Sequence, residues 1–241
     1  GRGFVHVRKN PMLGPSVDTL RTLGAKVASD IKYKYHIHRL FSSVFMHAGV
    51  IHLVMNLWMQ STLCLDYERR WGFWKTGIIF WLSGIGGNLL SCCMRPWNVS
   101  VGASGAILGI LGARVSDITY RWDRITESEK MINATNLLFI LLFNFGMVFS
   151  LNPSTTSTVD YPAHVGGFLV GLICGIILFC NELRDEGSQH GGGSGSGSSR
   201  SFVHKHWKQL ISIVIGLFLL ICYFVSTSLV FALVVPVKNI Y

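Results

Sequence analysis

Apolar residues run along this chain in long unbroken segments, rather than at the regular spacing of one half-buried face. A hydrocarbon core about 30 Å thick needs roughly 20 apolar helical residues to cross it. The pattern therefore predicts an all-α polytopic membrane protein. Five segments come close to that length or exceed it: residues 40–65, 77–94, 132–151, 163–180 and 210–237.

A sixth apolar segment, residues 101–113, is too short to cross alone because it stops before Arg114 and Asp117. At about 1.5 Å per residue it covers only about 20 Å. A short, glycine-interrupted helix among full-length ones is typical of a helix that starts half-buried and lines a cavity. The alternative is a helix that tilts little in a thinned bilayer. We expect it to be the fourth helix of a bundle.

Composition agrees with a membrane protein. Half of the 241 residues are hydrophobic, only 14% are charged, and the mean hydropathy is +0.43, whereas a soluble domain has roughly 25% charged residues. The net charge of +9 lies between the apolar segments, so the membrane explains it better than nucleic acid does. No cysteine forms a CxxC pair or has a histidine at zinc spacing, so we expect no disulfide framework, no metal and no cofactor.

Basic residues predict the orientation of the helices. The connections 66–76, 114–131 and 181–209 carry 11 Lys and Arg, against 2 in 95–100, 152–162 and the tail, so the first group should face the cytoplasm. The first 40 residues carry eight more, on the opposite side. We expect an additional N-terminal crossing helix, not included in this chain, to reconcile the two counts. Residues 191–199, GGGSGSGSS, are a flexible linker by composition.

Polar side chains inside the apolar segments are expensive and usually functional. His47, His52 and Asn56 all fall in the second predicted helix. At 100° per residue His52 and Asn56 are about 40° apart, whereas His47 is about 140° from His52. We therefore expect His52 and Asn56 to point at one target and His47 to point elsewhere, as a satisfied structural histidine.

Two other helix starts carry candidate chemistry. Ser104, in Gly102-Ala103-Ser104-Gly105, begins the short helix, where free backbone N–H groups suit an oxyanion; the plainer interpretation is a serine N-cap. His164 begins the sixth helix. Each helix has a stripe of small residues, and packing of these stripes would bring Ser104 and His164 within hydrogen-bonding reach. The stripes are Gly105, Gly109 and Ala113, and Gly167, Gly171 and Gly175.

A serine beside a neutral histidine is the minimum for a nucleophile with its general base. Asp160 is the nearest candidate for a third member, but helix capping is its expected role. The sequence therefore predicts a dyad without a carboxylate. Asn88 is expected to form a hydrogen bond between helices.

In this order, on successive membrane helices, these motifs resemble the rhomboid intramembrane serine proteases, over about residues 10–180. The segment Asn10–Ser16, NPMLGPS, is similar to the outer first loop of eukaryotic members, and Glu68-x-Arg70 with Gly72 to the family's cytoplasmic turn. The motifs that carry the resemblance are His47-x4-His52-x3-Asn56, Gly102-x-Ser104-Gly105 and Ala163-His164-x2-Gly167-x3-Gly171.

The resemblance implies Ser104 as nucleophile, His164 as general base, His52, Asn56 and the Ser104 amide as oxyanion hole, and His47 as a structural residue. It also implies cleavage of transmembrane helices of other proteins, within the lipid bilayer. Phe143, Phe145 and Phe149 would add bulk at the fifth helix, where substrates of the family enter. The eukaryotic layout implies an outer loop (1–40), a catalytic core (41–180), a cytoplasmic linker (181–209) and an additional C-terminal helix (210–237).

Two departures and two alternatives remain. The first-loop Trp-Arg of the family is His38-Arg39 here, and Leu108 stands where many members have an aromatic residue on the catalytic histidine. One alternative is a catalytically inactive relative that binds membrane clients; the other is a channel or transporter with a polar midplane site. We expect a membrane of the secretory pathway or the cell surface rather than a mitochondrial one.

Overall fold

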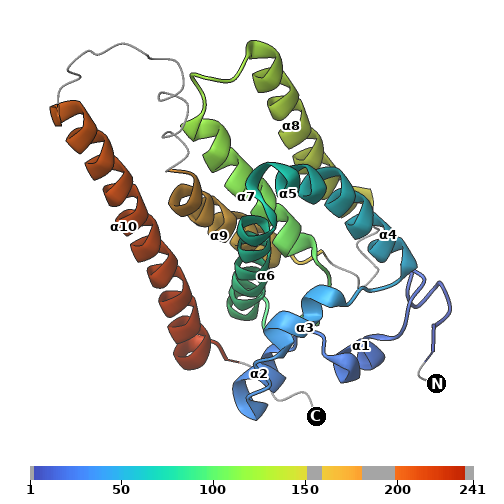
Figure 1. The fold of residues 1–241 in the computed structure, drawn as a ribbon. Helices are drawn as coiled ribbons and strands as arrows, with labels where there is room; N and C mark the ends of the chain where they lie inside the picture. The colour runs from blue at the N-terminus through green and yellow to red at the C-terminus, as the bar shows by residue number, and fades with distance from the viewer. Residues whose placement is uncertain (1–2, 151–158, 181–198, 237–241) are drawn as a thin grey trace.

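A computed structural model describes residues 3–150, 159–180 and 199–236 of the chain (Figure 1). The described residues are helical apart from loops and two isolated β-bridges, which confirms the all-α fold. The linker 191–199 lies almost wholly outside the described residues, as do the side chains of Phe143, Phe145 and Phe149. The helices are α1 (Val17–Leu23), α2 (Ala28–Lys34), α3 (Arg39–Phe45), α4 (Val50–Met59), η1 (Gln60–Cys64), α5 (Leu65–Trp71), α6 (Phe73–Met94), α7 (Ser104–Tyr120), α8 (Glu127–Ser150), α9 (Tyr161–Phe179), α10 (Ser199–Leu229) and η3 (Val230–Val234).

Three helices of the described residues are long and apolar enough to cross a membrane: α6, α9 and the segment Gln209–Val234. A fourth span results if α3 and the segment Val50–Trp71 are counted together. These spans make the chain an integral membrane protein.

The apolar segment 40–65 is not one continuous helix, so that prediction was wrong. α3 ends at Phe45, and the chain bends by 91° before α4 begins at Val50. The first amides of α4 are satisfied from outside the helix, because Val50 N–H donates to Leu13 O (3.1 Å) and Ile51 N–H donates to Met12 O (3.2 Å). These outer-loop carbonyls replace the intrahelical partners that a continuous helix would provide.

The short helix is longer than predicted. α7 has 17 residues and continues past Arg114 and Asp117 to Tyr120. Its charges are accommodated: Asp117 is buried against Arg121 one turn later, and the Arg114 guanidinium lies 4.8 Å from the centre of the Tyr67 ring. Paired charges do not have to end a helix. α7 still lies centrally, between α6 and α9 (Figure 1).

Glycine faces bring α7 and α9 into backbone contact. A Cβ on Gly167 would stand 2.0 Å from Gly105 O, and a Cβ on Gly171 would stand 1.9 Å from Gly109 O. No side chain fits at either distance, so only glycine lets the two backbones approach this closely. The contact begins at the first turn of both helices, and it therefore aligns their N-termini.

The outer loop lies at the same end of the bundle as these N-termini. Residues Lys26 and Ser100 exchange both backbone hydrogen bonds, which attaches the outer loop to the connection that leads into α7. In Figure 1, α1, α2 and α3 gather at this end, and the last turns of α10 reach α2 there. Asn88 of α6 bridges to α3, donating to Leu40 O (2.8 Å) and Ser43 Oγ (2.9 Å), as expected.

Candidate active site

Ser104 and His164 meet where α7 and α9 begin. The His164 Nε2 atom lies 2.8 Å from the Ser104 hydroxyl oxygen, which is hydrogen-bonding distance. Ser104 is the first residue of α7, and Ala103 occupies the cap position. The plainer interpretation of Ser104 as an N-cap is therefore wrong, and its hydroxyl is left to bond His164.

Gly102 shapes the approach to Ser104. Its φ of +125° lies in the left-handed region that favours glycine. A Cβ at Gly102 would stand 2.8 Å from His52 Cε1, 3.1 Å from His52 Nε2 and 3.8 Å from Ser104 Oγ. His52 Nε2 and Ser104 Oγ thus border the same small space, which stays open because residue 102 has no side chain.

Asn56 is on the same helix as His52, one turn later, but its amide does not share that target. Its Nδ2 donates to the backbone carbonyl of His52 at 2.9 Å. Its Oδ1 is buried and has no hydrogen-bond partner among the described residues. The structure therefore brings His52, but not the Asn56 amide group, toward Ser104.

His47 lies beside His52, which contradicts the helical-wheel prediction. The two rings are 5.3 Å apart at 69°, in an edge-to-face arrangement. The prediction placed His47 on the same helix, whereas His47 lies in the bend before α4, where 100° per residue does not apply. His47 Nε2 is buried without a partner in the described part of the chain.

Asp160 caps α9 and contacts a polar network that the sequence did not reveal. Its side chain accepts a hydrogen bond from Ala163 N (3.3 Å), as expected of a cap, and its backbone carbonyl accepts from His164 N (3.1 Å). Its carboxylate also accepts from the hydroxyls of Ser91 and Ser100. The third partner is Lys26, whose Nζ lies 3.7 Å away.

The Lys26 side chain is fully buried, with Nζ donating to Ser91 Oγ at 2.8 Å. Burial raises the pKa of Asp160, but the Lys26 charge and the two serine hydroxyls lower it further, so the carboxylate stays ionised. Ser100 lies four residues before Ser104 and Asp160 four before His164. This network thus connects the approaches to both helices, and no sequence motif pointed to Lys26.

Two neighbouring side chains complete the surroundings of the pair. Leu108, one turn after Ser104, is buried in the core of the bundle and supplies no ring. Tyr161 does, because its ring lies 6.4 Å from the His164 ring, centre to centre, in an edge-to-face arrangement. Within the described ranges, no group of three or more His, Cys, Asp or Glu side chains could hold a metal ion.

Comparison with known proteins identifies relatives for most of this chain. The model of the Rhomboid domain matches residues 34–181. RHOMBOID-like protein 4 of Arabidopsis thaliana is 36% identical over 175 residues, which are 73% of this chain and 42% of the relative. RHOMBOID-like protein 6, mitochondrial, of the same plant is 38% identical over 175 residues (73% and 54%).

A relative outside plants shows similar identity. Rhomboid-like protease 3 of Toxoplasma gondii is 35% identical over 173 residues, which are 71% of this chain and 62% of the relative. The chain spans about half the length of the curated relatives it matches.

Proposed function

Because this chain belongs to the rhomboid family, we propose that it is an intramembrane serine endopeptidase. It hydrolyses peptide bonds in the transmembrane helices of other membrane proteins by means of a Ser104–His164 dyad. The observation that carries the proposal is the 2.8 Å contact between His164 Nε2 and Ser104 Oγ. The contact joins two helix N-termini, where unpaired backbone amides surround the reacting groups.

The reaction follows the general logic of serine hydrolysis. Ser104 Oγ attacks the scissile carbonyl carbon while His164 Nε2 takes the hydroxyl proton. The tetrahedral intermediate collapses as His164 returns that proton to the leaving amine, and the acyl group stays on Ser104. Water, activated by His164, then releases the second product and restores both residues.

The developing oxyanion needs donors on the side of Ser104 that faces His52. His52 Nε2 borders the space beside Ser104 Oγ, and the Ser104 backbone N–H is an unpaired donor of the first turn of α7. Asn56 is the third candidate. It donates only after its amide leaves the His52 carbonyl, so we assign it the smallest share of the three.

The partners of this activity are transmembrane protein substrates and the lipid bilayer that presents them. The chemistry uses no cofactor or metal, and no nucleic acid takes part. We place the protein in a membrane of the secretory pathway or the cell surface. The relative named as mitochondrial makes mitochondrial targeting the alternative that a localisation experiment has to exclude.

The test is cleavage of a model transmembrane substrate in cell membranes, comparing the chain with its Ser104→Ala and His164→Ala variants. Each variant is expected to lower the cleavage rate by at least about a thousandfold, since the two groups act as one unit. Ser83→Ala is the matched control. It removes another buried serine hydroxyl, one without a hydrogen-bond partner among the described residues, and activity should persist.

Retained cleavage in the Ser104→Ala variant would exclude the dyad. Absence of cleavage by the parent chain, also when an N-terminal membrane helix is added, would overturn the proposal and favour the inactive relative that binds membrane clients. The close Ser104–His164 contact argues against that alternative, because a binding protein has no need of an aligned nucleophile and base.

A further inference from the structure

We infer that Asn10 is a positioning residue for the oxyanion hole: it holds the Ala48 segment, whose backbone N–H fixes the donor nitrogen of His52. Asn10 lies 24 residues before the matched Rhomboid domain, which begins at residue 34. The inference deepens the proposed function and rests on it for the word oxyanion. The positioning of His52 itself is measured independently below.

The first link is between Ala48 and the His52 ring. The Ala48 backbone N–H donates to His52 Nδ1, with the two nitrogens 3.3 Å apart. A neutral imidazole has one protonated and one accepting nitrogen, so acceptance at Nδ1 places the proton on Nε2. His52 Nε2 is the atom that borders the open space beside Ser104 Oγ. The bond from Ala48 therefore makes His52 a donor on the side where the oxyanion forms.

The second link is between Asn10 and Ala48. Asn10 Nδ2 donates to the Ala48 carbonyl at 2.7 Å and to the Pro15 carbonyl at 2.9 Å, and Asn10 Oδ1 accepts from Met12 N at 3.0 Å. One side chain thus closes its own loop and holds the residue that bonds His52. Ala48 lies in the bend between α3 and α4, so helical hydrogen bonding does not fix its orientation.

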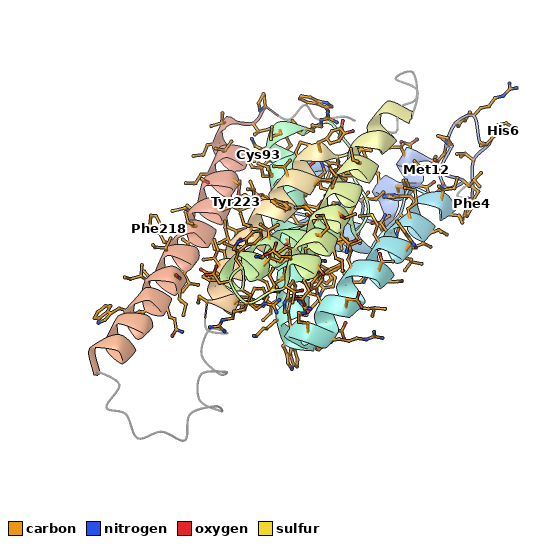
Figure 2. The ribbon with its side chains drawn as sticks, turned by 90° about the horizontal axis from the view of Figure 1, so that it is seen from above. Phe4, His6, Met12, Cys93, Phe218 and Tyr223 are labelled. Carbon is orange, nitrogen blue, oxygen red and sulfur yellow. The ribbon has the colours of Figure 1, made fainter. Side chains whose placement is uncertain are left out.

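Close backbone packing leaves the bend little freedom to compensate. A Cβ on Gly14 would stand 2.1 Å from Ala48 O, and a Cβ on Gly49 would stand 2.1 Å from Met12 O. In Figure 2, Met12 belongs to the N-terminal loop lying against the beginning of α4. These approaches of the loop to the bend involve backbone atoms, whereas Asn10 holds Ala48 through its side-chain amide. Asn10 is therefore the residue that a substitution can test.

The decisive variant is Asn10→Asp. Aspartate keeps the oxygen that accepts from Met12 but replaces the donor to Ala48 O with a second acceptor, which repels that carbonyl. We expect kcat to fall about tenfold with little change in KM, less than the roughly 10²–10³ that removal of an oxyanion donor costs. Gly3→Asp is the control. It adds the same charge to the same segment at an exposed position with nothing within 4 Å of its Cβ.

A double-mutant cycle separates action through His52 from general loosening. In a His52→Ala background, Asn10→Asp should have no further effect on kcat, because the group it positions is gone. The same tenfold loss in that background would overturn the inference. If the aspartate variant does not fold, Asn10→Ala replaces it, since alanine removes the donor without adding charge.

The tautomer of His52 provides a readout that does not need activity. In protein labelled with ¹⁵N-histidine, the His52 signals, assigned by their loss in His52→Gln, should show a protonated Nε2 and an unprotonated Nδ1. Asn10→Asp should convert part of this population to the Nδ1-protonated form. An unchanged tautomer would overturn the inference. A changed tautomer in a parent chain that cleaves nothing would refute the proposed function and leave the positioning of His52 intact.

Discussion

Asp30 gathers the cations of the outer loop. Its buried carboxylate lies 3.0 Å from Arg21, 3.1 Å from Lys34 and 3.6 Å from Arg39. Arg39 also donates to the carbonyls of Arg21 and Ala25, so the arginine of the altered His38-Arg39 pair still anchors the loop. Burial raises the pKa of Asp30, but hydrogen bonds from Arg21 and Lys34 outweigh that effect and lower it to about 2.

The depressed pKa predicts a pH dependence of stability. The folded pKa lies below the unfolded value near 3.9, so the stabilisation is complete above about pH 5 and is lost as the pH falls toward 2. A shift of this size corresponds to about 2 kcal/mol. Asp30→Asn should therefore lower the free energy of unfolding by about 2 kcal/mol at pH 7 and weaken its dependence on acid.

Thermal unfolding in micelles at pH 7 and at pH 3 measures both effects. Asp18→Asn is the matched control, because Asp18 is exposed on α1. Equal effects of the two substitutions would show that the cluster around Asp30 does not stabilise the outer loop.

At the scale of elements, the contact between α7 and α9 decides the geometry of the site. Ser104 and His164 occupy the first turns of these two helices, so the spacing of the helices sets the distance between the reacting atoms. That spacing is limited by backbone contact at Gly105–Gly167 and Gly109–Gly171. A widening of a few tenths of an ångström here would weaken the 2.8 Å hydrogen bond.

Gly171→Ala is expected to lower the free energy of unfolding by about 2 kcal/mol or more, since a rigid backbone carbonyl obstructs the new methyl group. Cleavage should decrease as well, because the helices separate. Gly77→Ala is the control, since no atom lies within 4 Å of its Cβ and alanine favours a helix by about 1 kcal/mol. Thermal unfolding of both variants, with the cleavage assay, tests this. Equal stability of the two would contradict it.

At the scale of the whole molecule, the fold moderates an unusual distribution of charge. The first 40 residues carry eight Lys and Arg, yet they lie at the end of the bundle expected to face away from the cytoplasm. Four of these cations are paired with carboxylates: Arg21, Lys34 and Arg39 with Asp30, and Lys26 with Asp160. Pairing reduces the net charge of the loop, so the count of basic residues alone overstates its preference for the cytoplasmic side.

The C-terminal helix connects the outer loop to the bundle. Tyr223 of α10 donates to Gly86 O of α6 at 2.9 Å, and Lys32 of α2 donates to Val235 O at 2.7 Å. Phe231 packs with Val235 and with residues of α2 and α6 in a small core of their own. α10 thus holds α2 against α6, close to the buried Lys26.

Phe231→Ala should loosen this junction, speed hydrogen exchange in residues 28–34 and lower the free energy of unfolding by about 3 kcal/mol. Phe218→Ala is the matched control. Phe218 is 65% exposed and lies on the side of α10 that is turned away from the bundle (Figure 2), so its loss should leave exchange unchanged. Equal exchange in both variants would show that α10 does not support the loop.

Features that depend on neighbouring residues could be predicted from the sequence. Long apolar segments predict membrane helices because the bilayer demands about 20 apolar residues, and the Rhomboid match agrees with the fold they imply. The glycine stripes predicted the contact between α7 and α9, because residues four apart share a helix face. Ser104 and His164 then had to lie near each other, since both begin those helices. Their roles in catalysis stay predictions for the cleavage assay.

Other features were decided only by the tertiary structure. The bend before α4 exists because carbonyls of residues 12 and 13 satisfy amides of residues 50 and 51, and this bend brings His47 beside His52. The Lys26–Asp160 pair joins residues 134 positions apart, and Asn10 reaches Ala48 across 38. No local pattern records such contacts, because each depends on where two distant segments come to rest. The sequence alone thus determined which helices form and which side chains carry the chemistry, and packing decided how those side chains are oriented.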